Sequence, residues 1–330
     1  MKPLLSTLLL STALGLPGEH LDAARTFWEG WREVAKPEKS YSAAPVAKER
    51  VLLWVPKGSS KSKLKKTSEK TVKLFDALFE DAPHVEGATP RTAVLFELVG
   101  PKSLEAATGH AAAQVPRLAG WAASARSGTG FVLEEPLAAG WMKSVPGVEV
   151  WSPENELANR LARLLTLERF GRQPHWLAQG LAWHLEIGVC KDVYCFPYRT
   201  GFVSKKEHRS WPRMLADQME ARGERPVEMA ELAGWRRSSW DAPRAGLAWG
   251  AATMLAEHYE DELPRVLAAF AALRVKDGRD VAADGSWTWI PDYEIPAEGQ
   301  LELLDRELGV DFLEELGRFA RKPKGYRRPR

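Results

Sequence analysis

The feature that most constrains this chain is a pair of helices joined by a short turn, between residues 152 and 186. Ser152 with the proline and glutamate after it is a helix start, with a hydroxyl N-cap, a proline in the first turn and an acid near the positive end of the dipole. The helical pattern continues to about Phe170, residues 171–174 form a turn, and HWLAQGLAWHLE (175–186) is a second helix. We expect the second helix to return antiparallel to the first.

Strands precede this helical hairpin and helices follow it. The predicted strands, at 50–56, 92–99, 131–135 and 148–151, are apolar and rich in β-branched or aromatic residues. Between them we expect a helix around Val72, Phe75 and Phe79, and a long alanine-rich helix over 103–126. Beyond about Trp211 the chain is predicted to be largely helical, most clearly at Leu247–Tyr259, Leu263–Leu273, Leu301–Leu308 and Asp311–Phe319. This order predicts an α+β fold with a helical C-terminal part.

The N-terminus is typical of a secretory signal peptide. A basic Lys2 precedes a stretch that is mostly apolar up to Leu16, and the small residues Ala13 and Gly15 form a cleavage signal. The stretch is too short to span a bilayer, which takes about 20 apolar residues. We therefore expect residues 1–18 to be removed and the protein to be exported, to the periplasm or the extracellular space. Residues 19–35 are predicted to form an amphipathic helix, and 36–48 a connector.

The charge balance argues against nucleic acid as a partner. The chain has 46 Lys and Arg against 44 Asp and Glu, a net charge of +2. Basic residues concentrate in two stretches, Lys57 to Lys70 and Lys322 to Arg330. We interpret the first as the solvated face of a helix and the second as a frayed tail. Contact with anionic envelope polymers is the alternative for both.

The chain has only two cysteines, Cys190 and Cys195. In an exported protein, two cysteines this close can close a small disulfide loop, and we favour that pairing over two free buried thiols. Two cysteines without a nearby pair of histidines do not make a structural zinc site.

Polar side chains gather at one level of the predicted hairpin. Asn155 and Asn159 lie one helical turn apart, so their side chains share a face. Glu156 is next to the first of them, and Gln179 follows 20 residues after the second, where the returning helix would bring it opposite the pair. Zinc peptidases use this arrangement in the motif H-E-x-x-H with a later glutamate, in which the first glutamate is the general base.

On these residues the chain resembles the gluzincin metallopeptidases, most closely the exported peptidase MA-like family. Its pattern, H-E-[LF]-x-H followed by W-L-x-E-G-x-A-x-x-x-E, corresponds here to NELAN (155–159) and to WLAQGLA (176–182) with Glu186 at the end. The resemblance covers about residues 48–320, including LDRELGVDFLEELGRFA (304–320). It implies a zincin-like domain with a small mixed sheet and active-site-type helices. The organisation is then an N-terminal helix and linker (19–47), a zincin-like α+β part (48–190) and a helical part (191–330), which together form one peptidase-like unit.

The chain departs from the family at every ligand position. Asn155, Asn159 and Gln179 offer neutral carbonyl oxygens, whereas zinc prefers imidazole, thiolate or carboxylate donors. Without the metal, Glu156 has no activated water to act on. We therefore expect no metal, no cofactor and no zinc peptidase activity. The leading hypothesis is a binding or scaffolding role for a peptide or protein, in which an edge strand beside the old cleft pairs with an extended chain.

The sequence leaves several alternatives open. The amides and Glu156 also suit a hydrogen-bonded network that replaces the metal in holding the two helices together, which needs no ligand. A hydrolase with relocated chemistry, through Glu156 and His175, is a second possibility. The third is a carbohydrate-binding envelope protein that uses exposed tryptophans, of which the chain has 14 in all. His175, Trp176 and Trp183 are the candidate neighbours of the cleft. Trp54, Trp151 and Trp176 are expected in the core, and Trp183, Trp235, Trp240, Trp287 and Trp289 are the candidates for exposure.

Overall fold

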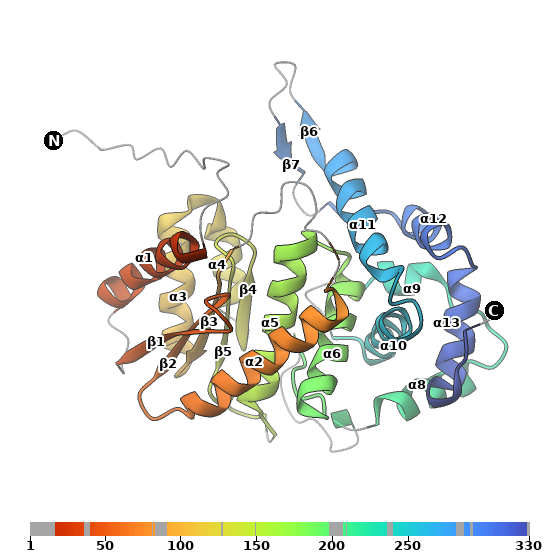
Figure 1. The fold of residues 1–330 in the computed structure, drawn as a ribbon, viewed down its shortest axis with the longest axis horizontal. Coiled ribbons are helices and arrows are strands. Elements are labelled where there is room, and N and C mark those ends of the chain that lie inside the picture. Colours follow the sequence, from red (N-terminus) through yellow and green to blue (C-terminus); the bar gives the residue numbers. More distant parts are fainter. Residues whose placement is uncertain are drawn as a thin grey trace.

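A computed structural model of the chain confirms the α+β class. It describes residues 17–35, 40–80, 82, 91–126, 128–148, 150–197, 207–208, 210–235, 240–281, 287–290 and 293–328. A five-stranded mixed sheet with helices on both faces forms one half of the molecule, and helices dominate the other half (Figure 1). Apart from Pro17 and Gly18, the predicted signal peptide lies outside the described residues.

The sheet has the strand order β1-β2-β3-β5-β4. The strands are β1 (Tyr41–Val46), β2 (Val51–Pro56), β3 (Ala93–Leu98), β4 (Gly130–Leu133) and β5 (Ala138–Met142). β2, β3 and β5 are parallel, whereas β1 and β4 run antiparallel to their neighbours at the two edges. One antiparallel edge, β4, therefore lies on the side of the sheet where the chain enters the helical hairpin.

The central strands are buried on both faces, and alternate residues serve two different cores. On β2, Leu53 and Val55 belong to the core shared with the helical half, while Leu52 and Trp54 belong to the core on the other face. Helices α1 (Pro17–Ala35), α3 (Pro101–Gln114) and α4 (Ala119–Ala125) cover this second face (Figure 1). Helices α2 (Lys61–Leu78) and α5 (Pro153–Phe170) cover the first.

One of the two expectations for the N-terminal segment is wrong. The helix over 19–35 is confirmed as α1, but the predicted connector at 36–48 contains the edge strand β1. Its Pro45 hid the strand, because proline is tolerated in a sheet chiefly at an edge, where its missing N–H breaks no ladder bond. α1 is part of the sheet layer, since Trp28 and Trp31 are fully buried against it.

Two predicted elements before the hairpin are wrong. The single helix over 103–126 is divided, because Pro116 cannot donate a helical N–H and disfavours the α conformation of Val115. α3 ends at Gln114, and a 3-10 turn, η1 (Pro116–Leu118), leads into α4. The predicted strand at 148–151 is not formed by its described residues, and the sheet instead uses β5, whose sequence AAGWM has little intrinsic strand preference.

The helical hairpin forms as predicted. α5 begins after Ser152, whose hydroxyl accepts the backbone N–H of Asn155 at 3.4 Å, and it ends at Gly171, which has a positive φ of 68°. α6 (His175–Cys190) follows after four residues and extends one turn beyond the predicted end. The two helices pack against each other, and α5 also packs against β3, β4 and β5.

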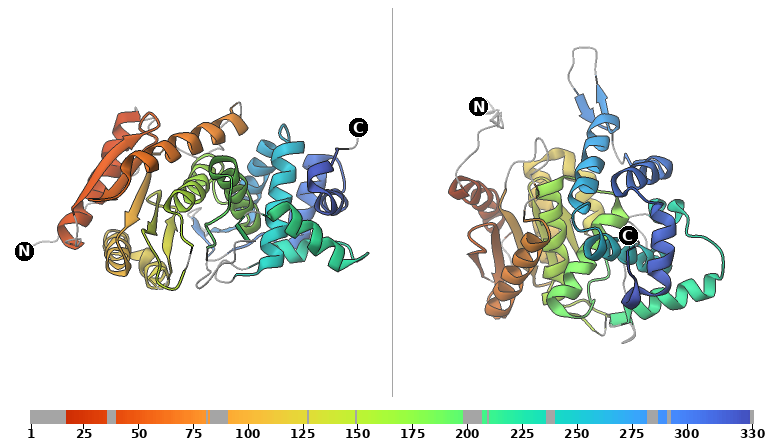
Figure 2. Two further views of the ribbon diagram at one scale, coloured as in Figure 1. Left: turned by 90° about the horizontal axis from the view of Figure 1, so that it is seen from below. Right: turned by 45° about the vertical axis from the view of Figure 1, so that its right-hand side comes forward.

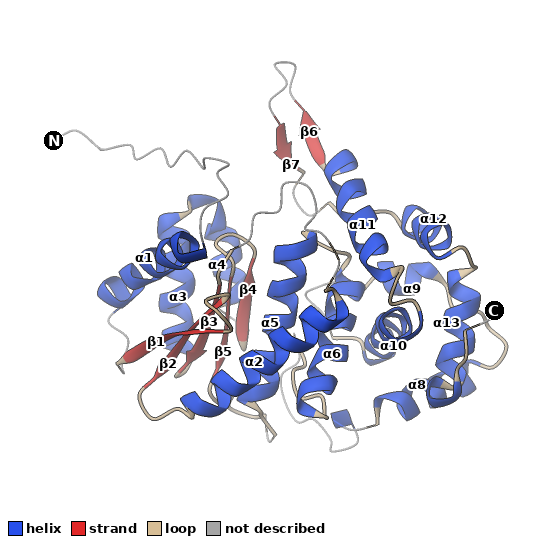
Figure 3. Cartoon of the chain, viewed as in Figure 1, coloured by secondary structure: helices blue, strands red, loops and turns tan. Residues whose placement is uncertain are grey.

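The helices of the C-terminal part lie on the side of α6 that faces away from the sheet (Figure 3). They are α8 (Trp211–Arg222), α9 (Met229–Ala233), α10 (Ala242–His258), α11 (Leu263–Asp277), α12 (Ala297–Leu308), α13 (Phe312–Arg321) and a 3-10 turn, η2 (Pro323–Gly325). A two-stranded ribbon, β6 (Arg279–Val281) and β7 (Trp287–Trp289), follows α11 and was not predicted. One continuous core runs from β2 through α6 to α13. No helix in the described ranges is long and apolar enough to cross a bilayer.

Candidate functional site

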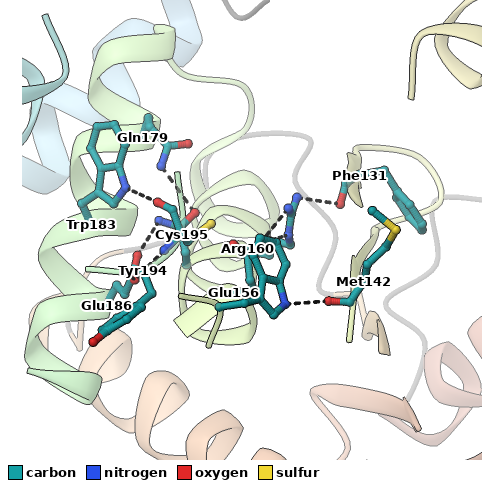
Figure 4. Close-up of polar contacts among 11 residues, drawn as sticks. Phe131, Met142, Glu156, Arg160, Gln179, Trp183, Glu186, Tyr194 and Cys195 are labelled. Carbon is teal, nitrogen blue, oxygen red and sulfur yellow. Dashed lines mark hydrogen bonds and ion pairs between the residues drawn. The ribbon is translucent and has the colours of Figure 1, made fainter. Parts of the chain in front are cut away.

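A buried carboxylate lies at the centre of the candidate site. Glu186, on α6, accepts the side-chain N–H of Asn155 at 2.8 Å on one oxygen and that of Asn159 at 3.1 Å on the other. The backbone N–H groups of Tyr194 and Cys195 donate to the first oxygen at 2.7 and 3.0 Å (Figure 4). Glu186 is fully buried. One carboxylate thus joins α5, α6 and the segment after α6.

The carbonyl oxygens of the two asparagines are also occupied. Oδ1 of Asn155 accepts the hydroxyl of Ser152 at 2.7 Å, and its Nδ2 has a second acceptor, the Asp192 carbonyl, at 2.7 Å. Oδ1 of Asn159 accepts Nε2 of Gln179 at 3.4 Å. Of the three predicted ligand oxygens, only Oε1 of Gln179 has no hydrogen-bond partner in the described part of the chain.

The structure therefore brings Asn155, Asn159 and Gln179 together as predicted, but around a carboxylate. Each asparagine donates a side-chain N–H to Glu186 on the other helix. All three amide residues are 4% exposed or less. This geometry fits the alternative given above, a hydrogen-bonded network that joins the two helices of the hairpin.

Burial sets the protonation of the central carboxylate. Desolvation raises the pKa of Glu186 to about 8, although its N–H donors favour the ionised form. In metal centres, a carboxylate beside the ligands often accepts a hydrogen bond from a metal-bound histidine, through the ring N–H that does not bind the metal. Glu186 would occupy that position if histidines replaced Asn155 and Asn159.

The predicted general base, Glu156, is engaged elsewhere. Its Oε2 accepts Nη2 and Nε of Arg160 at 2.8 and 3.1 Å, and this ion pair is buried. Nη1 of Arg160 reaches the carbonyl of Phe131 on β4 at 3.4 Å, so the pair ties α5 to the edge strand (Figure 4). Desolvation raises the pKa of Glu156, while Arg160 and the thiol of Cys195 oppose the rise. None of the contacts of Glu156 is with His175.

The predicted disulfide between Cys190 and Cys195 is wrong, since both cysteines are free. Cys195 is fully buried, and its thiol is hydrogen-bonded to Glu156. Its backbone is fixed on both sides, by Glu186 at its N–H and by the indole N–H of Trp183 at its carbonyl, 2.8 Å away. Burial raises the pKa of both thiols, to about 12 for Cys190. Neither thiol is therefore a reactive nucleophile.

The apolar residues of the WLAQGLA segment have packing roles. A Cβ atom on Gly180 would lie 2.2 Å from the Ala248 carbonyl, so glycine is required where α10 crosses α6. Trp176 is buried and donates to the side chain of Gln300 at 2.8 Å, which places it against α12 and not in a cleft.

No family model and no curated protein matches the chain. The resemblance to the gluzincins therefore stays a prediction from the sequence motif. Among the residues that the structure describes, no group of three or more His, Cys, Asp or Glu is arranged to hold a metal ion. The amide oxygens do not fit zinc either, because two of the three already accept hydrogen bonds.

An open hollow of about 240 Å³ lies beside the edge strand β4. Apolar side chains from α4, η1 and β4 line one side of it, and the end of α5 and the start of α6 line the other. His175 lines the hollow, as expected of a cleft neighbour, and its ring packs on Trp235 with centroids 4.6 Å apart. Gln173 also lines it, is 4% exposed, and no described group donates to its Oε1.

Two of the five tryptophans proposed as exposed are buried. Trp183 and Trp235 are buried and stack on each other with ring centroids 5.7 Å apart, so Trp183 does not line a cleft. Trp240 is half-buried, and Trp54 and Trp176 lie in the core as expected. Trp151 is half-buried, and its N–H donates to the Met142 carbonyl at 2.8 Å. The exposure of Trp287 and Trp289 lies outside what the structure describes.

Two residues that organise the site were not singled out from the sequence. Glu186 was quoted only as the end of the family pattern, although it lies seven residues, two helical turns, after Gln179 on the same face. Arg160 was missed, although it lies four residues after Glu156, the spacing of a helical ion pair. Both signals were present in the sequence.

Proposed function

We propose that this chain is an exported, gluzincin-like protein that has lost zinc chemistry and binds extended peptides along β4. The observation that carries the first part is the occupation of the ligand positions. Oδ1 of Asn155 and of Asn159, the atoms that would face a cation, accept hydrogen bonds from Ser152 and Gln179. To bind zinc, the site would have to break these bonds and separate both amides from Glu186.

The same geometry removes the second requirement of metal-assisted hydrolysis. A general base must reach the water that it deprotonates, and the carboxylate of Glu156 is held in a buried contact in which two N–H groups of Arg160 donate to one of its oxygens. Releasing Glu156 would break this buried ion pair, which costs about 3–5 kcal/mol. The pair supports a structural role for Glu156.

Peptide binding is supported by the open edge of β4. In an antiparallel pair, alternate residues direct their backbone groups to the partner strand. The backbone N–H of Met142 donates to the carbonyl of Thr129, so the backbone groups of Thr129 point to β5. By alternation, the backbone groups of Phe131 and Leu133 also point to β5, and those of Gly130 and Val132 point away from it. The outward groups are available to an added strand.

The hollow beside this edge matches a peptide side chain in size. Its volume of about 240 Å³ is below the roughly 300–1,000 Å³ of sites for drug-sized ligands, and it is large enough for one or two side chains. Leu118 and Trp121 provide apolar contact, and the open acceptor Oε1 of Gln173 would receive an N–H or O–H from the ligand. We infer that the bound residue carries an apolar body and a donor group.

A proline substitution tests strand addition directly. Val132→Pro removes the outward N–H without breaking a bond to β5, and Val132→Ala keeps that N–H while trimming the side chain to a similar extent. We expect fluorescein-labelled peptides from a casein digest to bind the wild type and Val132→Ala, measured by fluorescence anisotropy, and to lose at least tenfold in affinity for Val132→Pro. Equal binding by all three proteins would refute pairing at β4.

The competing hydrolase is tested in the same preparation. Cleavage of intact casein that a chelator blocks, or one equivalent of zinc in the purified protein, would contradict the loss of zinc chemistry. No structural observation favours relocated chemistry, because Glu156 is held by Arg160 rather than by His175. None favours a carbohydrate site either, since Trp183 and Trp235 are buried.

A further inference from the structure

Helix α2 carries a dense row of lysines on its outer face. Residues 57–73 contain seven lysines, six of them on α2 and one just before it, and all are exposed. The opposite face of the helix is buried through Leu64, Val72 and Phe75. In the described ranges, none of the seven forms an ion pair with a carboxylate. The lysines are therefore free to meet an external anion.

This segment has the opposite charge to the rest of the chain. Residues 57–73 contain seven lysines and one acid, Glu69, a net charge of +6. The whole chain has 46 basic and 44 acidic residues, so the remainder has 39 and 43 and a net charge of −4. The nearly neutral total thus conceals a strongly polarised molecule, which an anionic surface would orient with α2 facing it.

The shape of this face suits a flat surface. α2 has 18 residues and is about 27 Å long at 1.5 Å per residue. It lies along one margin of the molecule, across the outside of the sheet and hairpin (Figure 2, left). Lys143 extends the basic area, since its ammonium group reaches the Gly58 carbonyl at 3.2 Å next to the start of the helix.

We propose that the outer face of α2 binds the surface of an anionic phospholipid bilayer. The contact is electrostatic and does not insert, because the only large apolar side chains exposed in the described chain, Val275 and Ile290, lie far from α2 in the sequence, one in α11 and one after β7. A planar array of headgroups can contact the exposed side of α2 from Lys61 to Lys73.

The test is cosedimentation with vesicles of phosphatidylcholine, with and without about 30 mol % phosphatidylglycerol, at about 0.1 M and about 1 M salt. We expect the full chain to bind only the anionic vesicles and only at low salt. The variant Lys65→Gln/Lys66→Gln/Lys70→Gln/Lys73→Gln should lose on the order of several hundredfold in affinity, because each lysine near such a surface contributes roughly fivefold.

A second variant controls for net charge. Lys276→Gln/Lys322→Gln/Lys324→Gln/Arg327→Gln removes four exposed basic groups outside α2 and should bind like the wild type. The proposal is overturned if the wild type stays in the supernatant, or if the two variants bind equally. It is also overturned if α2-dependent binding is found with a DNA duplex and not with vesicles. Circular dichroism of both variants confirms that they fold.

Discussion

Replacing Glu186 tests whether the polar network holds the two helices together. In Glu186→Leu, at least two fully buried donors lose their acceptor, Nδ2 of Asn159 and the backbone N–H of Cys195. An unsatisfied buried N–H costs about 1–3 kcal/mol, so the expected loss of stability is about 2–6 kcal/mol. This is a large part of the roughly 5–15 kcal/mol that stabilises a typical domain.

The matched variant, Glu186→Gln, keeps the shape and should be tolerated. Its amide oxygen takes the three bonds of the first carboxylate oxygen, and its NH₂ then faces the NH₂ of Asn159. Rotation of the Asn159 amide removes this clash, and rotation of the Gln179 amide then lets its Oε1, the one open acceptor of the network among the described residues, accept an N–H of Asn159. We expect a cost below about 1.5 kcal/mol, since all but one of the bonds are replaced.

Urea unfolding followed by tryptophan fluorescence measures both costs. Trp183 reports on the site because its indole N–H is bonded to the Cys195 carbonyl. The reasoning predicts a much lower midpoint for Glu186→Leu than for Glu186→Gln. Equal midpoints, or a leucine variant within about 1 kcal/mol of the wild type, would show that the network contributes little.

Three further predictions concern the same hairpin. Glu156→Gln should destabilise the protein by about 3–5 kcal/mol by breaking the buried ion pair with Arg160, whereas Glu154→Gln in the same turn should change stability by less than about 0.5 kcal/mol. A Glu156→Gln variant as stable as the wild type would mean that the carboxylate is not structural. Gly180→Ala should cost about 1–3 kcal/mol of stability because the added Cβ would overlap the Ala248 carbonyl. Gly120→Ala, where the added Cβ meets open space, should be neutral or stabilising. Similar melting temperatures for the two variants would contradict the close contact between α6 and α10. Burial raises the pKa of Glu186 from an ordinary 4.5 to about 8, so the native state keeps a proton that the unfolded chain releases. The contribution of Glu186 to the free energy of unfolding should be full below about pH 4.5 and should be lost as the pH rises through 8. In urea titrations at several pH values, Glu186→Gln should lack this dependence of stability on pH.

Local signals predicted most of the elements, and tertiary context decided the rest. The hairpin was predictable because its cap, proline and turn residues act within a few positions of one another. β5 was not, because alanine and glycine form a strand there only through pairing with β3 and β4. β1 was missed for a related reason, since Pro45 is acceptable only at an edge that the sequence does not reveal.

The sequence predicts which amide residues form the site, but not that Glu186 lies between them. Helical spacing places Asn155, Asn159 and Gln179 together, and the structure agrees. Periodicity does not tell which polar group occupies the space between two packed helices, because that depends on the exact approach of α5 to α6. Glu186 takes that place because the segment after α6 turns back and donates two backbone N–H groups to it.

The most direct test of the proposal that Asn155, Asn159 and Gln179 occupy former zinc-ligand positions is a zinc titration of the wild type beside Asn155→His/Asn159→His/Gln179→Glu. The triple variant restores two imidazoles and a carboxylate where the amides now meet, with Glu186 placed to accept a histidine N–H. By isothermal titration calorimetry we expect the variant to bind one zinc ion with at least a thousandfold gain in affinity, and the wild type to bind none tightly. Stoichiometric tight zinc in the wild type, or no gain in a folded variant, would contradict the account.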